Sequence, residues 1–492
     1  MQDFFSRLSD LLVYDASNPM LFNSGLFMVL FVIFLLIYQS IRHHTRLRML
    51  FAIAFSLYFY YKSSEWCVFI LAGVCISDYL LGLWLGRTIS SCHRKCIVAL
   101  NVAINVGMLV YFKYFNLLYS AFSSIVSSHF EPFDIILPAG ISFFTFRSIS
   151  YMVDIYRGQI EPCRNFLNYT FYLTFFPPLL AGPVVRARDI LPQVENPQHV
   201  SPQMISEALF LIMTGLVKKV LIADYISGNF VDRIFDNPML YSGFENMVGC
   251  IGFTIQLYCD FSGYSDMAIG IALLLGYRFK ENFAAPFKSQ SPTEFWRRWH
   301  ISLSLWLRDY IYIPLGGNRH GRTRAYINQM LTMVIGGLWH GASWMYILWG
   351  AYHGFLLIAH KALKSVWHLP ENMKGRPEVK IFNIAITFVL VVAGFTLFRA
   401  PSLTVAGEIF YQIFTSFHLS VAPQFVQSYL LIVLAIAGAY IAHMAPRAWC
   451  DNTGQAYMDM PLVGQAILLA VILFLVVQTR QSELVPFIYL QY

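Results

Sequence analysis

The stretch GGLWHGASWMYILWG, residues 336–350, is typical of a membrane-embedded segment, yet it contains a histidine, His340. Its other side chains are mainly tryptophans and aliphatic residues, with glycines between them. The whole chain has the same character, because 57% of its 492 residues are hydrophobic and only 12% are charged. A soluble globular protein carries about 25% charged residues. The composition therefore predicts an integral membrane protein and raises the question of what an imidazole does there.

Apolar runs of helix length recur along the chain, and several approach the roughly 20 residues that are needed to span a bilayer. They lack the alternation of every second residue that marks a transmembrane barrel, and in lipid only helices or closed barrels satisfy the backbone. We therefore predict an all-α polytopic membrane protein with about 11–13 transmembrane helices. The runs are 22–41, 48–61, 66–86, 97–119, 135–153, 206–226, 247–276, 326–338, 342–364, 380–398, 427–444 and 464–478.

The two ends of the chain differ from this membrane domain, which we assign to residues 21–480. Residues 1–20 begin MQDFFSRLSDLLVYD, which places apolar side chains on one helical face and lacks the basic start of a secretory signal. We predict an interfacial amphipathic helix there, with a frayed terminus as the alternative. Residues 481–492 form an aromatic C-terminal tail that includes Tyr489.

Loop charges predict the orientation in the membrane. The loops 42–48 and 87–96 contain arginine and lysine, whereas the loop 120–136 contains neither. Because cytoplasmic loops carry the excess of basic residues, we expect an extracytoplasmic N-terminus and cytoplasmic loops at 42–48 and 87–96. This bias accounts for much of the net charge of +7, so no nucleic-acid partner is expected.

One segment, 277–325, is both basic and aromatic, with nine arginines and lysines against three acidic residues. We predict short helices and turns that are partly re-entrant and buried in protein at membrane depth. Within it, Arg297 and Arg298 suit either a lipid headgroup or the phosphates of an acyl donor such as coenzyme A or a carrier protein. Their position in the sequence leaves both interpretations open.

Two histidines, His300 and His340, are the candidate chemical groups of the apolar segments. An ionisable residue at membrane depth is costly and is a functional hypothesis by default. Histidine is suited to proton transfer near neutral pH, and an apolar surround disfavours its charged form. The alternatives are a buried His340 bonded to a carbonyl group and a solvated His300. We interpret the other histidines, including His353, as structural.

Two carboxylates, Asp260 and Asp266, lie in the apolar run QLYCDFSGYSDMAIG, residues 256–270. Buried carboxylates need polar partners, and four hydroxyls are near in sequence, so we interpret the cluster as structural. The chain contains no P-loop, dinucleotide-binding, metalloprotease or nucleophile-elbow motif. Its eight cysteines lack a zinc-ligand spacing, and we expect no metal and no disulfide framework. The four hydroxyls belong to Tyr258, Ser262, Tyr264 and Ser265.

Five segments closely resemble the membrane-bound O-acyltransferases (MBOAT), and within them a bacterial branch that serves alginate O-acetylation, peptidoglycan O-acetylation and D-alanyl transfer to teichoic acids. They occur in the order found in the family, over roughly residues 20–480. The segments are LPAGISFFTFRSISYMVDIYRG (137–158), FFPPLLAGPVVR (175–186), QLYCDFSGYSDMAIGIALLLGYRFKENFAAPF (256–287), FWRRWHISLSLWLRDYIYIPLGGNR (295–319) and GGLWHGASWMYILWGAYHG (336–354).

The resemblance implies a ring of helices with a central funnel and a site that is reached from both sides of the membrane. His340 matches the histidine regarded as catalytic, and His300 matches the second family histidine. On chemical grounds we expect His300 to orient the donor or to stabilise the oxyanion. The resemblance suggests no metal and no bound cofactor; acetyl-CoA or an acyl carrier protein is the co-substrate. Candidate substrate-binding residues in these motifs are Arg297, Arg298, Trp299, Asn318 and Trp339.

The function implied is transfer, by an inner-membrane protein, of an acyl group, acetyl in the first instance, from a cytoplasmic thioester to a hydroxyl of an extracytoplasmic polysaccharide or cell-wall polymer. A periplasmic partner of the SGNH type is a candidate for the final transfer. The tail PFIYLQY resembles a short family tail whose tyrosine carries the acyl group, which makes Tyr489 a candidate carrier; an aromatic interfacial anchor is the alternative. The rival functions are D-alanyl transfer, an acyl-group transporter and a non-catalytic scaffold.

Overall fold

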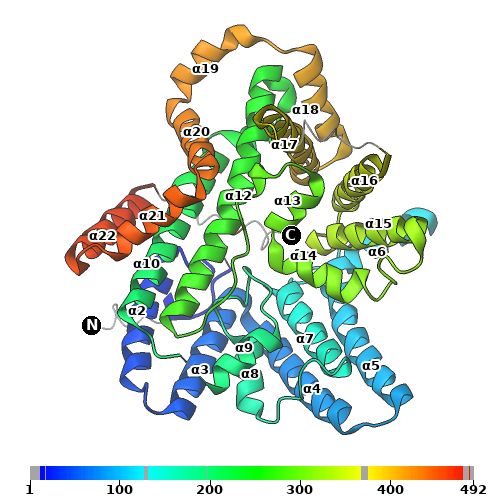
Figure 1. The fold of residues 1–492 in the computed structure, drawn as a ribbon, viewed down its shortest axis with the longest axis vertical. Helices are drawn as coiled ribbons and strands as arrows, with labels where there is room; N and C mark the ends of the chain where they lie inside the picture. The colour runs from blue at the N-terminus through cyan, green and yellow to red at the C-terminus, as the bar shows by residue number, and fades with distance from the viewer. Residues whose placement is uncertain are drawn as a thin grey trace. The chain divides into compact units, whose positions relative to one another are not determined.

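The computed structural model describes residues 11–16, 18–126, 131–196, 198–366, 375–479 and 487 (Figure 1). These residues form helices and connecting turns, and no β-strand occurs among them. The predicted all-α fold is therefore confirmed. Most of the predicted N-terminal helix 1–20 and nearly all of the tail 481–492, with Tyr489, lie outside the described residues, so those two assignments stay predictions.

Several helices have the length and apolar character of membrane spans. Within the described ranges, four helical segments are long and apolar enough to cross a membrane, and a bent pair of helices makes a fifth if it counts as one span. The chain is thus a polytopic membrane protein, whereas the number of about 11–13 spans, the ring, the funnel and the orientation stay predictions. The five are Thr45–Arg87, Ser91–Val126, Pro377–Arg399, Leu462–Thr479 and the pair Leu419–Ser428 with Leu430–Met444.

The chain divides into two compact units. Unit 1 comprises residues up to Ile205 together with Met267–Lys280, and unit 2 comprises Ser206–Asp266 and Glu281–Gln481. Two helices, α10 (Pro202–Leu216) and α12 (Gly243–Leu274), contribute residues to both units. The remaining helices of unit 1 are α2 (Gly25–Ser40), α3 (Thr45–Ser64), η1 (Glu65–Cys67), α4 (Val68–Arg87), α5 (Ser91–Leu109), η2 (Val110–Tyr114), α6 (Phe115–Val126), α7 (Ile141–Tyr156), α8 (Phe166–Thr174) and α9 (Ala187–Glu195).

Unit 1 holds the charged side chain of Arg147 in its interior by pairing it with main-chain carbonyl groups. Helix α7 packs against α4 and α5 (Figure 1). From α7, the buried Arg147 donates hydrogen bonds to the carbonyl oxygens of Tyr172, Leu173 and Pro178, at 3.3, 3.0 and 3.0 Å. Three carbonyl groups thus solvate the guanidinium group in place of water. The same bonds fix the turn that follows α8.

Unit 2 contains the two candidate histidines. Its most extensive helix pair is α15 with α16, which also contacts α17. The helices of this unit besides α10 and α12 are η3 (Val217–Asp224), η4 (Ser227–Val231), α11 (Asp232–Asp236), η5 (Pro238–Leu240), η6 (Pro286–Lys288), α13 (Pro292–Arg298), α14 (Ile301–Leu307), η7 (Arg308–Tyr312), α15 (Gly321–His340), α16 (Trp344–Val366), α17 (Pro377–Arg399), α18 (Leu403–Thr415), η9 (Leu419–Val421), α19 (Ala422–Ser428), α20 (Leu430–Met444), α21 (Arg447–Met458) and α22 (Leu462–Thr479).

The carboxylates of α12 pair with two successive lysines of the π-helix η3. Lys218 Nζ lies 2.6 Å from Asp266, and Lys219 Nζ lies 2.5 Å from Asp260 and 2.8 Å from Asp224. The structural interpretation of Asp260 and Asp266 agrees with this arrangement, but lysines, and not the neighbouring hydroxyls considered from the sequence, supply the ion pairs. The network joins η3 to α12 in the interior of unit 2.

We expect Lys219→Met to destabilise the protein by about 3–5 kcal/mol, because it removes the ammonium group that two buried carboxylates share. Lys219 is 3% exposed. Thermal unfolding in detergent or lipid nanodiscs measures the effect. Lys218→Met is the matched control and should cost less, since Lys218 is partly exposed and its ion pair is with one carboxylate, that of Asp266. A larger loss for Lys218→Met would contradict the assignment.

Candidate active site

The segment after α12 consists of short helices and turns, as the sequence predicts. Ser291 begins α13 by accepting a hydrogen bond at Oγ from the Glu294 N–H, at 3.2 Å. Helix α14 and the π-helix η7 follow after His300. The apolar run 326–338 is part of a longer helix than predicted, because α15 begins at Gly321, inside the segment assigned as re-entrant.

His300 occupies a strained and buried position between α13 and α14. Its backbone is left-handed, with φ +41° and ψ 58°, a conformation that residues other than glycine adopt rarely. The residue is 0% exposed, so the alternative of a solvated histidine is wrong. The ring of Phe261 lies edge-on against the imidazole, with 4.5 Å between ring centroids.

Asn282 holds His300 through both its main chain and its side chain. The Ile301 N–H donates to the Asn282 carbonyl oxygen at 2.9 Å. The Asn282 side-chain oxygen lies 3.2 Å from His300 Nδ1 and 3.2 Å from the Ser302 nitrogen. Sequence reasoning missed Asn282, which is one polar residue in a turn and has no motif spacing that links it to His300.

His340 is the last residue of α15 and is enclosed by aromatic rings. Its side chain is 4% exposed. The centroids of Trp339, Trp349 and Phe398 lie 4.7, 4.9 and 5.1 Å from the centroid of the imidazole. Two tryptophans of the opening motif, Trp339 and Trp349, therefore surround the histidine, whereas the third, Trp344, is 68% exposed. Access to His340 from either side of the membrane stays a prediction.

Glycines allow α15 and α16 to approach closely enough to form this enclosure. A Cβ atom on Gly337 would lie 2.2 Å from the Tyr346 carbonyl oxygen, and one on Gly350 would lie 2.4 Å from the Met333 carbonyl oxygen. A Cβ atom on Gly341 would meet the Tyr346 ring at 2.3 Å. Since the two backbones touch at Gly337 and Gly350, and the Tyr346 ring packs on Gly341, close packing of α15 on α16 sets the position of His340.

The structure brings the two histidines into one aromatic cluster. The ring of Trp339 lies between them in the chain of contacts, with its centroid 6.0 Å from that of His300 and 4.7 Å from that of His340. Trp299 also belongs to the buried core, where its ring stacks on Phe295 at 5.6 Å. Both tryptophans are therefore part of the aromatic cluster around the histidines. Their assignment to substrate binding stays a prediction.

His353 adds a third buried imidazole to the cluster. Its ring centroid lies 4.8 Å from that of Trp349 and 5.3 Å from that of Trp296. The sequence interpretation assigned it a structural role, and these aromatic contacts are compatible with that role. No group of three or more metal-binding side chains is found in the part of the chain that the structure describes.

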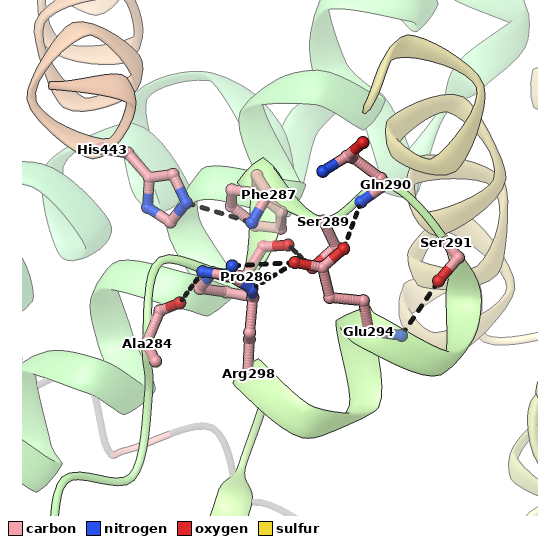
Figure 2. A network of polar contacts seen from close by, with 9 residues as sticks. All are labelled: Ala284, Pro286, Phe287, Ser289, Gln290, Ser291, Glu294, Arg298 and His443. Carbon is pink, nitrogen blue, oxygen red and sulfur yellow. Dashed lines mark hydrogen bonds and ion pairs between the residues drawn. The ribbon is translucent and has the colours of Figure 1, made fainter. Parts of the chain in front are cut away.

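The arginine pair divides into one bound and one exposed side chain. Figure 2 shows Arg298 beside Glu294, with 2.9 Å from Nε and 2.8 Å from Nη2 to the carboxylate oxygen, and with Nη1 donating to the Ala284 carbonyl oxygen at 3.1 Å. Glu294 also accepts from the Gln290 N–H at 2.9 Å, so Arg298 braces the loop before α13. Arg297 is exposed, and no ion-pair partner for it occurs among the described residues.

The last candidate from the sequence, Asn318, lies apart from these contacts. It is exposed in the turn after η7, and its side-chain oxygen accepts a hydrogen bond from the Tyr312 hydroxyl. Within the described ranges, no hydrogen bond joins Asn318 to either of the two histidines. Its assignment to substrate binding therefore stays a prediction.

Comparison with known proteins gives this cluster its context. Residues 163–398 match the profile of MBOAT, the membrane-bound O-acyltransferase family. The "Probable alginate O-acetylase AlgI" of Pseudomonas putida is 42% identical over 402 residues, which cover 80% of each protein. The chain belongs to the membrane-bound O-acyltransferase family. It is accordingly an O-acyltransferase, and both histidines lie within the matched residues.

Two further relatives show the range of the similarity. The "Peptidoglycan O-acetyltransferase" of Helicobacter pylori is 35% identical over 420 residues, with 79% of each chain covered. The "Teichoic acid D-alanyltransferase" of Bacillus subtilis is 27% identical over 285 residues, which cover 55% of this chain and 70% of that protein. The similarity is thus broader and stronger toward the two O-acetylating relatives.

If Arg297 binds the phosphates of an acyl donor, one of its two interpretations, Arg297→Ala should raise the KM for acetyl-CoA about tenfold or more, because a charge-assisted bond to a phosphate contributes about 1.5–3 kcal/mol. The matched variant Arg298→Ala should instead lower the amount of folded protein, since it removes the brace on Glu294 and Ala284. Steady-state kinetics on purified protein, with abundance measured in parallel, separate the two effects. An unchanged KM in Arg297→Ala would favour the lipid-headgroup interpretation.

Proposed function

We propose that this membrane enzyme transfers an acyl group, acetyl in the first instance, from a cytoplasmic thioester to a hydroxyl of an extracytoplasmic polysaccharide or cell-wall polymer. The support is the 42% identity to a relative named for alginate O-acetylation, together with His340 in its aromatic enclosure. Acetyl-CoA or an acylated carrier protein is the co-substrate. The inner membrane, with the N-terminus outside the cytoplasm, is the location that fits this direction of transfer.

In the proposed reaction His340 is the general base. It takes the proton of the attacking hydroxyl, and the hydroxyl oxygen forms a bond to the thioester carbonyl carbon. When the tetrahedral intermediate collapses, the carbon–sulfur bond breaks and the proton passes from the imidazole to the leaving thiolate. The products are an O-acyl ester and a free thiol, so atoms and charge balance.

The burial of both histidines favours a slender substrate at the site. His300 and His340 have almost no exposed surface, so a reacting group reaches them only through the protein interior. An acyl chain on a thioester arm is narrow, whereas a polysaccharide is bulky. This contrast supports entry of the donor through the predicted funnel and leaves room for a periplasmic partner of the SGNH type to complete the transfer to the polymer.

D-alanyl transfer is the second candidate. It is supported by the relative named for that activity, but the similarity covers a smaller part of this chain than the match to the O-acetylating relatives. Transport of acyl groups and a non-catalytic scaffold are the rivals outside enzymology. Substitution of His340 separates these rivals from the enzyme, because neither of them needs a general base.

We expect His340→Ala to lower transfer of labelled acetyl from acetyl-CoA to extracted polymer by about 10²–10⁴-fold, the contribution that general base catalysis makes. Membranes with matched amounts of protein are the assay material. His353→Gln is a control for the loss of a buried imidazole, since His353 is equally enclosed by aromatic rings. If labelling survives in His340→Ala, or if both variants lose labelling equally, the assignment of His340 as the general base is wrong.

The carrier proposal for Tyr489 has its own test. If its hydroxyl carries the acyl group, Tyr489→Phe abolishes labelling of the polymer while thioester hydrolysis at the membrane persists, because the nucleophilic oxygen is gone but the ring remains. Mass spectrometry of the C-terminal peptide should show an acyl adduct in the wild type. Unchanged labelling in Tyr489→Phe means that the tail serves as an anchor.

A further inference from the structure

The side chain of Asn282 collects several hydrogen bonds at one oxygen atom. This residue is 1% exposed. Its Oδ1 atom faces His300 Nδ1 at 3.2 Å, the Ser302 main-chain nitrogen at 3.2 Å and the Ser302 hydroxyl at 2.8 Å. Its Nδ2 atom donates to the Ser265 hydroxyl at 3.2 Å. A turn residue, α12 and the start of α14 are thereby joined around His300.

These contacts determine which way round the amide group lies. A main-chain N–H is only a donor, so the Asn282 atom that faces the Ser302 nitrogen has to be the oxygen. The same oxygen faces His300 Nδ1, which therefore carries a hydrogen. In a neutral imidazole one nitrogen donates and the other accepts. The accepting lone pair of His300 is consequently on Nε2.

The main chain keeps the imidazole in this arrangement. The Ile301 N–H binds the Asn282 carbonyl oxygen at 2.9 Å, beside the left-handed backbone of His300. A non-glycine residue in that conformation costs about 1–3 kcal/mol and persists only where its surroundings fix it. Phe261 lies edge-on to the ring, at an interplanar angle of 87°, and limits its rotation.

We propose that Asn282 is a positioning residue for acyl transfer, which holds His300 as the Nδ1–H tautomer so that Nε2 accepts a hydrogen bond from the substrate. The proposal rests on the function proposed above. It argues against stabilisation of the oxyanion by neutral His300, because an oxyanion needs a donor. The partner of Nε2 is a donor group, and we assign it to an amide N–H of the pantetheine arm, which is narrow enough for a fully buried position.

The tautomer has a direct test that does not need activity. Protein labelled with ¹⁵N-histidine, compared by NMR with His300→Gln protein, isolates the His300 signals. We expect a protonated Nδ1 and an unprotonated Nε2 in the wild type. A protonated Nε2 overturns the proposal even if acyl transfer is confirmed, and absence of acyl transfer with the expected tautomer overturns the proposed function while leaving the geometric assignment intact.

Variants of Asn282 test the positioning role. Asn282→Leu removes the acceptor, so both tautomers become populated, and we expect kcat/KM to fall by at least about tenfold. Asn282→Asp keeps an acceptor but adds a negative charge, which favours the imidazolium form. Nε2 of His300 is then protonated at a higher pH than in the wild type. The pH at which activity falls on the acid side should therefore rise by at least about one pH unit. Ser302→Ala leaves the main-chain N–H in place and should not move that limb.

The kinetic constants separate the two possible sources of the donor group. A rise in the KM for acetyl-CoA in Asn282→Leu, with the acceptor KM unchanged, supports the pantetheine arm. A rise confined to the acceptor KM overturns that assignment in favour of the attacking hydroxyl. If folded Asn282→Asp has the wild-type pH profile, the residue is only structural and the proposal fails.

Discussion

Desolvation of polar groups is the constraint on which the rest of this structure depends. In an apolar interior a charged or hydrogen-bonding group has to find its partner within the protein. Lys219 forms ion pairs with two carboxylates, and Arg147 donates hydrogen bonds to three carbonyl groups. The side chain of Asn282 forms a hydrogen bond with His300. Each solution also joins segments that are far apart in the sequence. These buried ion pairs and hydrogen bonds therefore hold the helices and turns that they connect at fixed positions.

The candidate site combines such buried hydrogen bonds with close main-chain packing. Glycines bring α15 and α16 into contact, and this contact places His340 at the end of α15 among aromatic rings. His300 reaches the same cluster from a turn that Asn282 secures. One histidine is therefore placed by helix packing and the other by hydrogen bonds. Trp339 lies against both imidazole rings. A displacement of either histidine would therefore change the packing around the other.

The helices could largely be predicted from the sequence, since a long apolar run in lipid has few alternatives to a helix. The runs 342–364 and 380–398 correspond closely to α16 and α17. His300 and His340 could be found because ionisable residues are scarce in such runs. The polar partners of these buried groups could not be predicted from the sequence. Lys219 is distant in sequence from Asp260, and Asn282 comes into contact with His300 only in the folded turn. The start of α15 was missed because its first residues are polar.

The left-handed backbone at His300 lowers the stability of the turn that contains it. Glycine would adopt this conformation without strain, yet the chain places a bulky imidazole there. A glycine at this position would relax the turn at the same time as it removed the ring. For this reason the yield or thermal stability of a His300→Gly variant is a poor guide to what the loss of the imidazole does to the protein, because the same substitution also removes the backbone strain.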